Sequence, residues 1–201
     1  MSSKVNFSVL CVSACCALLL CTCDKRHVTQ TGFTKADSLT ETYLALQDTM
    51  LQAWNVMIHD DNRKIKAMGH LLHELTIINP EKRDELNAYE ERLNDLKSLR
   101  YNQHTMSDSG IVSEYDFASN SLVAELVSQA ESQKEFGYND TLQKLVESIR
   151  TADQRVNNYR EEYDLIASRL NRFIERNKGM LTELAEDSLL QKKPLFQMAA
   201  E

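Results

Sequence analysis

The sequence predicts an all-α protein, an up-and-down bundle of three to four long antiparallel helices behind an N-terminal lipoprotein signal peptide. Apolar residues recur every three or four positions over long stretches, which places them on one face of a helix. No segment alternates apolar and polar residues for long enough to suggest a sheet. All five cysteines lie between positions 11 and 23, whereas a disulfide framework or a zinc site would spread its cysteines through the fold.

Residues 1–22 are predicted to be a signal peptide. Lys4 gives a positive start, and the apolar stretch from Phe7 to Leu20 is shorter than the roughly 20 residues of a bilayer span. The sequence Leu20-Cys21-Thr22-Cys23 then resembles a bacterial lipobox, which predicts cleavage before Cys23 and lipid attachment to its thiol. Three acyl chains, at about 0.8 kcal/mol per buried CH₂, hold a protein to a membrane. We therefore expect a lipid-anchored protein that faces the periplasm or the cell exterior.

Other interpretations of this segment remain open. Val12-Ser13-Ala14-Cys15 fits the lipobox pattern better by letter, but a cut there leaves only about eight apolar residues before the site. An uncleaved amino-terminal anchor or a palmitoylated cysteine cluster would also tether the chain to a membrane. Residues 23–36, which begin with the lipidated cysteine, are polar without apolar periodicity and are predicted to be a flexible linker.

Residues 37–201 are predicted to form the helical bundle domain. The first helix begins near Ser38, which has capping-box spacing to Glu41, and ends at Asn79 because Pro80 disfavours helical geometry in the residue before it. Neighbouring acids such as Asp60 and Asp61 are interpreted as solvated helix charges. The apolar face of this helix is formed by Tyr43, Leu46, Met50, Trp54, Met57, Ile65, Met68, Leu72, Leu75 and Ile78.

Three further helices are expected at 80–102, 113–136 and 139–176, with a loop at 103–112. Asp140 is the N-cap candidate of the last helix, which at about 35 residues would span on the order of 50 Å. Helices this long with one apolar face each must pack side by side. The expected apolar positions are Leu86, Tyr89, Leu93, Leu96 and Leu99, then Phe117, Leu122, Leu126 and Ala130, and finally Leu142, Leu145, Ile149, Ala152, Val156, Tyr159, Tyr163, Ile166, Leu170 and Phe173.

Candidate catalytic motifs are weak. His70 and His73 lie three residues apart beside a carboxylate, but their spacing does not match the His-Glu-x-x-His motif of metal hydrolases. Solvated or half-buried histidines are the simpler interpretation, and a metal-dependent hydrolase stays an alternative. No glutamate has a histidine three residues later, and the five glycines cannot form a phosphate or dinucleotide loop. We expect no enzyme activity, no catalytic or metal-binding residues, no cofactor and no small-molecule substrate.

Charge limits the expected partners. The net charge of −7 and the pI near 5.3 argue against duplex nucleic acid, which needs a clustered basic surface. Arg169, Arg172 and Arg176 share one face at the end of the last helix. This basic stripe is a candidate interaction surface, for a protein or for anionic lipid, although cations also complement a helix carboxyl end. Trp54 is interpreted as a core residue.

The first and last helices carry short sequence motifs. They are Gln52-Ala53-Trp54, Arg63-Lys64 and Met68-Gly69-His70-Leu71-Leu72 in the first helix, and Val156, Arg160, Tyr163-Asp164, Ala167, Leu170-Asn171 and Ile174 in the last. With these motifs, parts of the chain resemble the LemA family of membrane-attached helical proteins. The end, from Lys192 to Gln197, is similar to that family's short Phe-rich tail. The resemblance implies a membrane anchor and a helical bundle outside the cytoplasm, without catalytic residues. We therefore expect a non-catalytic scaffold or interaction module of the bacterial envelope with an unidentified envelope protein partner. A self-associating coiled coil is the remaining alternative.

Overall fold

The computed structural model describes residues 34–184 and 190–196. The chain divides into two compact units, Met1–Thr34 and Lys35–Glu201, and almost all described residues belong to the second. The predicted signal peptide, Cys23 and nearly all of the linker at 23–36 lie outside the described residues.

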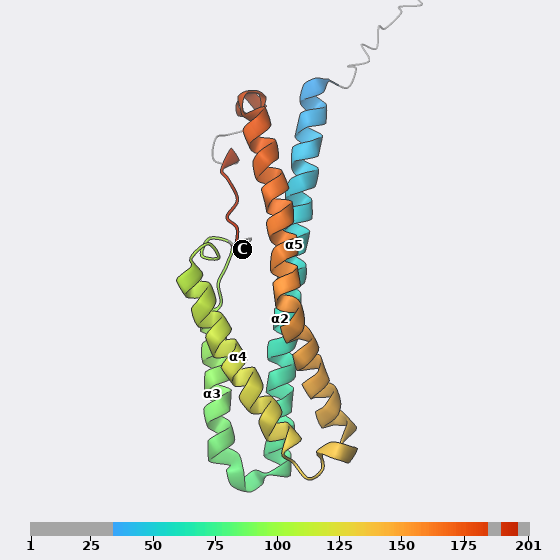
Figure 1. Ribbon diagram of the computed structural model, residues 1–201, viewed down its shortest axis with the longest axis vertical. Coiled ribbons are helices and arrows are strands. Elements are labelled where there is room, and N and C mark those ends of the chain that lie inside the picture. The colour runs from blue at the N-terminus through green and yellow to red at the C-terminus, as the bar shows by residue number, and fades with distance from the viewer. Residues whose placement is uncertain (1–33, 185–189, 197–201) are drawn as a thin grey trace, which may run out of the picture. The chain divides into compact units, whose positions relative to one another are not determined.

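The second unit is a bundle of four long helices with two short 3₁₀ turns. In order, these elements are α2 (Lys35–Ile78), η1 (Pro80–Lys82), α3 (Arg83–Leu99), α4 (Ser109–Glu131), η2 (Phe136–Tyr138) and α5 (Asp140–Leu184). Successive long helices run in opposite directions, and the described residues contain no strand (Figure 1). The predicted all-α, up-and-down bundle is therefore confirmed.

The two longest helices form the frame of the unit. α2 has 44 residues and α5 has 45, and they pack against each other along much of their length. α3 has 17 residues and α4 has 23, so they cover only the part of this pair that includes the end of α2 and the start of α5 (Figure 1). The unit therefore has a four-helix part, and a part in which α2 and α5 extend beyond α3 and α4.

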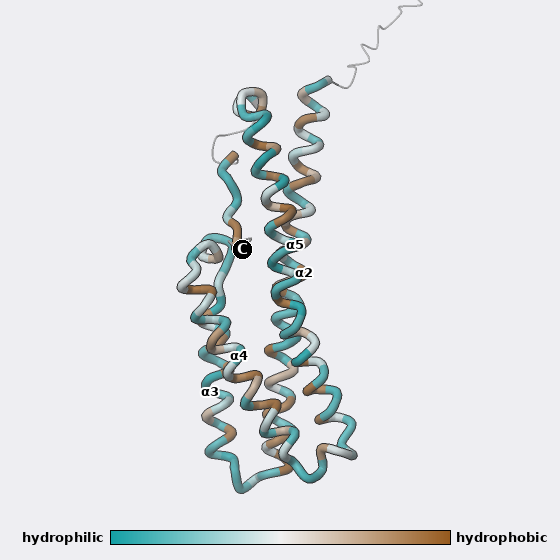
Figure 2. The backbone as a smooth tube through the Cα atoms, in the orientation of Figure 1, coloured by the Kyte–Doolittle hydropathy of each residue, from teal (hydrophilic) through white to brown (hydrophobic). Residues whose placement is uncertain are grey.

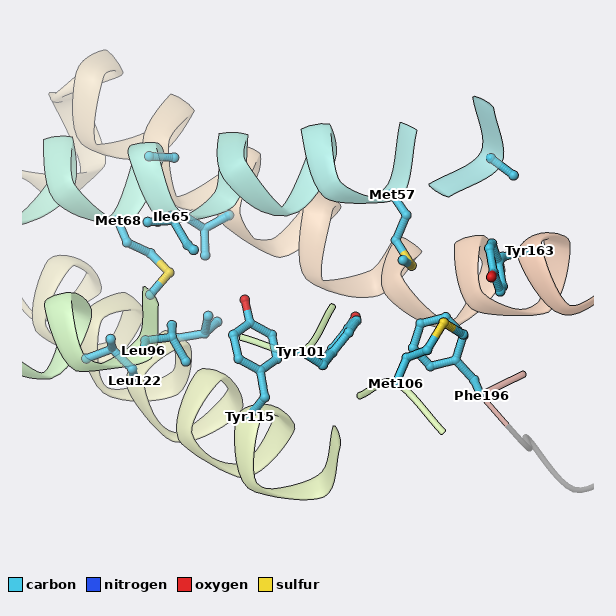
Figure 3. Close-up of a cluster of buried hydrophobic side chains, with 14 of the residues drawn as sticks. Met57, Ile65, Met68, Leu96, Tyr101, Met106, Tyr115, Leu122, Tyr163 and Phe196 are labelled. Atoms are coloured by element: carbon cyan, nitrogen blue, oxygen red, sulfur yellow. The ribbon is translucent and has the colours of Figure 1, made fainter. Parts of the chain in front are cut away.

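The core lies where the predicted apolar faces meet. Apolar and hydrophilic residues succeed one another along every helix (Figure 2). Ten of the buried side chains that join the four helices and their connections are labelled in a close-up (Figure 3). Full burial of one Leu or Met side chain stabilises the fold by about 1.5–3 kcal/mol. The side chains with at most 1 % exposure include Met68, Leu71, Leu75, Leu96, Leu122, Leu126, Leu142, Ile149 and Leu170.

Several helices begin or end at residues other than the predicted ones. α2 begins three residues before Ser38, so the expected capping box does not stand at its start. α4 begins at Ser109 rather than 113, because the Asp108 carboxylate accepts hydrogen bonds from Gly110 N and Ile111 N at 2.9 and 3.4 Å. It also ends earlier, at Glu131 rather than 136. α3 ends at Leu99, and α5 continues past 176 to Leu184.

The predicted N-cap of α5, Asp140, is wrong by one residue. The side chain of Asn139 accepts hydrogen bonds from Thr141 N and Leu142 N at 3.0 and 3.1 Å. Asn139 is thus the N-cap, and Asp140 is the first helical residue, where its charge suits the positive helix end.

One of the four predicted core positions of α4 is wrong, and Leu122, Leu126 and Ala130 are buried as predicted. Phe117 is 79 % exposed, whereas Tyr115 and Ser119 face the core together with the expected Leu122 and Leu126. Two residues of helix turn a side chain by about 200°, so Phe117 must point away once Tyr115 points inward. The same geometry places Phe117 about 140–220° from Leu122, Leu126 and Ala130. Tyr115, on the buried face, donates a hydrogen bond to Asp61 on α2.

Candidate functional site

The predicted basic stripe lies on the surface. Arg169, Arg172 and Arg176 are all exposed on the second half of α5. Arg172 lines an open depression of about 640 Å³ together with Asn171 and Lys192. The predicted lipid attachment residue, Cys23, lies outside the described residues.

The two histidines are also on the surface. His70 and His73 are exposed on α2, which confirms the interpretation that they are solvated. In the described part of the chain, no group of three or more His, Cys, Asp or Glu residues is placed to hold a metal ion.

The unexpected feature is a set of charged residues that crosses the bundle. We call it the ionic network and define it by four carboxylates and four cations, namely Asp60, Asp61, Asp116, Asp153, Lys64, Arg100, Arg155 and Arg160. These residues come from α2, α4, α5 and the end of α3. These eight residues carry equal numbers of opposite charges, and the exposed Arg63 also lies 3.9 Å from Asp60. Buried charges are tolerated when they are paired in this way.

The acidic pair on α2 is the centre of the network, contrary to the expectation of solvated charges. Asp60 is only 5 % exposed, and its carboxylate accepts hydrogen bonds from Arg155 of α5, the shorter at 2.6 Å. Asp61 accepts the Tyr115 hydroxyl at 2.7 Å and pairs with Arg100 at 2.7 Å. One turn of α2 thereby contacts the three other long helices or their ends.

Lys64 is the buried cation of α2, with 3 % exposure. Its ammonium donates to the Ser119 hydroxyl at 2.9 Å and to Asp153 at 3.2 Å, and it lies 3.7 Å from Asp61. A serine beside a lysine can serve as a nucleophile and its base. Here the ammonium already has two carboxylate partners, which is the arrangement of a structural ion pair.

Arg160 joins the ionic network to a group of aromatic rings. It is 4 % exposed, and it donates to both oxygens of Asp116 at 2.7 Å and to the Tyr101 hydroxyl at 3.2 Å. Its guanidinium lies 5.3 Å from the centre of the Tyr101 ring and 5.2 Å from that of Phe196. Burial lowers the pKa of Arg160, but the Asp116 carboxylate and Tyr101 outweigh burial, so the net effect raises it.

The rings around Arg160 form the aromatic cluster, which we define as Trp54, Tyr101, Tyr163 and Phe196. The Trp54 ring stacks on Phe196 at 6.4 Å between centres and meets the Tyr163 ring edge-on at 5.6 Å. Trp54 itself is half-buried and packs against the core, so its interpretation as a core residue holds in part. Burial raises the pKa of Tyr163 to about 12 and also raises that of Tyr101.

Phe196 belongs to a segment that returns along α5. We call Leu190–Phe196 the carboxyl-terminal segment; it runs beside α5 toward the connection between α3 and α4 (Figure 1). The Asn171 side chain donates to Lys193 O at 2.9 Å and accepts from Lys193 N at 2.7 Å. Asp164 accepts from Phe196 N at 2.9 Å. The segment is therefore bound through its backbone, through the Phe196 ring and through Leu190 and Leu195, whose side chains pack in or against the core.

Sequence reasoning did not find the ionic network, although a signal was present. Asp60, Asp61 and Lys64 interrupt the apolar face of α2, and Arg160 falls between Val156 and Tyr163 on the apolar face of α5. Opposite charges on two apolar faces that must meet indicate a buried ion pair.

No protein-family model, curated protein or solved structure matches this chain. The interpretation of its function therefore depends on the geometry and on the sequence itself.

Proposed function

We propose that this chain is a non-catalytic, membrane-anchored helical bundle of the bacterial cell envelope that serves as a scaffold or protein-interaction module. The observation that supports this most is the ionic network. Its buried charged groups pair with one another across helices and leave no isolated buried ion among its eight members. Such pairing favours one arrangement of the helices over others, which suits a rigid frame that presents surfaces to a partner.

The anchor is proposed from the amino-terminal sequence. Cys23 follows a lipobox-like sequence, and a linker of polar residues precedes the bundle. Within the described residues, none of the helices combines the length and the apolar character that crossing a bilayer requires. The sequence resemblance to the LemA family supports the same proposal, in which the bundle is held at a membrane outside the cytoplasm.

The anchor is tested by the intact mass of protein extracted from its host. We expect a chain that begins at Cys23 and carries a diacylglyceryl thioether and an acylated amino terminus. The variant Cys23→Ser should lose the lipid, whereas Cys15→Ser should keep it. An unmodified chain that begins at Met1 and is recovered from the aqueous fraction would contradict the proposal.

The interaction role is tested by photocrosslinking in the native envelope. A crosslinking amino acid replaces Arg172 in the basic stripe, and the matched control replaces the exposed Lys144 near the other end of the same helix. We expect one envelope protein to be crosslinked from position 172 and not from 144. The same products from both positions, or none from either, would contradict a specific interaction through this surface.

A further inference from the structure

We propose that the groove occupied by the carboxyl-terminal segment is a receptor for an extended segment of a partner protein, and that the chain's own segment is its built-in competitor. The partner segment carries an aromatic residue three positions after the residue whose backbone pairs with Asn171. This inference rests on the proposed function as an interaction module and names the site and the ligand chemistry.

The first argument is that the groove recognises backbone. Asn171 makes two reciprocal hydrogen bonds with Lys193, one to its N–H and one to its carbonyl, and Asp164 accepts from Phe196 N. None of these three bonds uses a side chain of the segment. Recognition of an extended peptide commonly divides in this way, with backbone hydrogen bonds for affinity and a pocket for specificity.

The second argument is that the groove contains one specific pocket. The Phe196 ring is part of a side chain only 8 % exposed, with the Tyr101 ring at 5.3 Å, the Tyr163 ring at 5.8 Å and the Arg160 guanidinium at 5.2 Å. Phe196 lies at one end of the cluster of buried side chains, with Tyr101, Met106 and Tyr163 (Figure 3). An aromatic residue is therefore the side chain that this pocket selects.

The third argument is that the walls of the pocket hold one another in place without the segment. Asp116 fixes Arg160 by two hydrogen bonds. Trp54 contacts Tyr163 at 5.6 Å between ring centres, and Tyr101 contacts Tyr115 at 5.4 Å. All of these residues come from α2, α4, α5 and the connection between α3 and α4. A preformed pocket binds a ligand with little ordering cost.

The fourth argument concerns charge and displacement. Lys192 pairs with Glu175 of α5 at 2.5 Å, but these side chains are 68 % and 53 % exposed, so the pair contributes little to the affinity of the groove. The open depression that contains Arg172 and Glu175 continues along the segment and leaves room at its side. A tethered segment competes at an effective concentration on the order of millimolar, which a partner of higher affinity overcomes.

The test uses the full chain and a labelled peptide of residues 190–196, LQKKPLF. In the variant Phe196→Ala the tethered segment no longer fills the aromatic pocket. We expect the peptide to bind this variant about tenfold or more tighter than the parental chain, because the tethered competitor is weakened. Trp54 is the single tryptophan of the sequence and stacks on Phe196, so its emission should shift in the variant and return when peptide is added.

Control peptides separate recognition from nonspecific binding. LQAKPLF should bind within about threefold of LQKKPLF, because the replaced Lys192 makes only an exposed ion pair with Glu175, whereas LQKKPLA should not bind. Within the Phe196→Ala chain, Asn171→Ala should weaken peptide binding about tenfold through loss of two hydrogen bonds. The matched control Asn177→Ala should not, because that amide donates only to its own helix at Phe173 O.

Three outcomes would overturn the proposal. One is a folded Phe196→Ala variant, shown by circular dichroism, that fails to bind the peptide. If that variant does not fold, the variant Lys193→Pro takes its place, because it removes the backbone N–H that donates to Asn171 and leaves the aromatic pocket unchanged. A folded Lys193→Pro variant that fails to bind the peptide would also overturn the proposal. The third outcome is that the parental chain forms a dimer in light scattering and the Phe196→Ala variant does not. The groove would then be occupied by the carboxyl-terminal segment of a second copy of this chain rather than by a partner protein. Peptide binding without any envelope crosslink would instead contradict the proposed cellular role and leave the receptor groove intact.

Discussion

Two arginines of α5 make ion pairs of equal length in different surroundings, which allows burial to be tested directly. Arg160 pairs with Asp116 at 2.7 Å and its side chain is 5 % exposed, whereas Arg150 pairs with Glu131 at 2.7 Å and is 45 % exposed. Breaking a fully buried pair costs about 3–5 kcal/mol because it leaves an uncompensated charge. The Asp116 side chain is 33 % exposed, so the lower end of this range applies to the Arg160 pair. An exposed pair contributes about 0–1 kcal/mol.

We therefore expect Arg160→Met to lower the free energy of unfolding by about 3 kcal/mol and Arg150→Met by less than about 1 kcal/mol. For a domain of this size, about 2–4 °C of Tm corresponds to 1 kcal/mol, so Arg160→Met should lower Tm by roughly 6–12 °C. Adding Asp116→Asn to Arg160→Met should recover part of the lost stability, because a neutral amide then replaces the unpaired carboxylate.

The measurement is urea unfolding followed by circular dichroism at 222 nm, with thermal melts at the same pH and salt. Equal losses for the Arg160→Met and Arg150→Met variants would refute the argument that burial, rather than distance, decides the strength of these pairs. An effect of Arg160→Met that disappears at high salt would refute it as well, because screening acts mainly on exposed charges.

Three further predictions concern packing, capping and pH. Leu122→Ala should cost about 2–5 kcal/mol in urea unfolding, whereas Phe117→Ser on the opposite face of α4 should change stability by less than about 0.5 kcal/mol; equal effects would contradict the observed orientation of α4. Asn139→Ala should cost about 0.5–2 kcal/mol by loss of the N-cap, whereas Asp140→Ala should cost less; the reverse order would restore the sequence-based assignment of the cap. Burial raises the pKa values of Tyr101, Tyr115 and Tyr163 above the ordinary value of 10.0, so the folded state favours the neutral phenol. The contribution of these tyrosines to stability is fully present below pH 10. Above pH 10 it falls by about 1.4 kcal/mol per pH unit for each tyrosine. Thermal melts from pH 8 to 12, with absorbance at 295 nm, measure this, and ionisation near pH 10 with helices retained would contradict it for Tyr101, Tyr115 and Tyr163.

The sequence was a good guide to elements defined by long periodic patterns. In α2 and α5 the apolar positions recur over about ten turns, and the predicted positions such as Met50, Leu72 and Leu170 are buried. The end of α2 before Pro80 was also predictable, because proline restricts the residue that precedes it. These features depend on local chemistry that the chain carries in order.

Other features depend on which helix lies opposite, and local patterns do not contain that information. Tyr115 was missed as a core residue because its partner, Asp61, is 54 residues away in sequence on α2. Asp60 was expected to be solvated because its partner, Arg155, is 95 residues away in sequence. The contact of Phe196 with Trp54 is equally nonlocal. The candidate site is built almost entirely from such long-range pairs, and it was therefore missed.

The unequal lengths of the helices also imply unequal resistance to opening. Beyond the ends of α3 and α4, the first turns of α2 are supported chiefly by the second half of α5 (Figure 1). Parts of a fold with fewer packed neighbours open with lower free energy than the rest, so amide protons there should exchange with solvent before those near Lys64. The first turns of α2 are the part of the bundle nearest in sequence to the amino terminus. A force applied at the amino terminus would therefore unfold these turns first and leave the four-helix part folded.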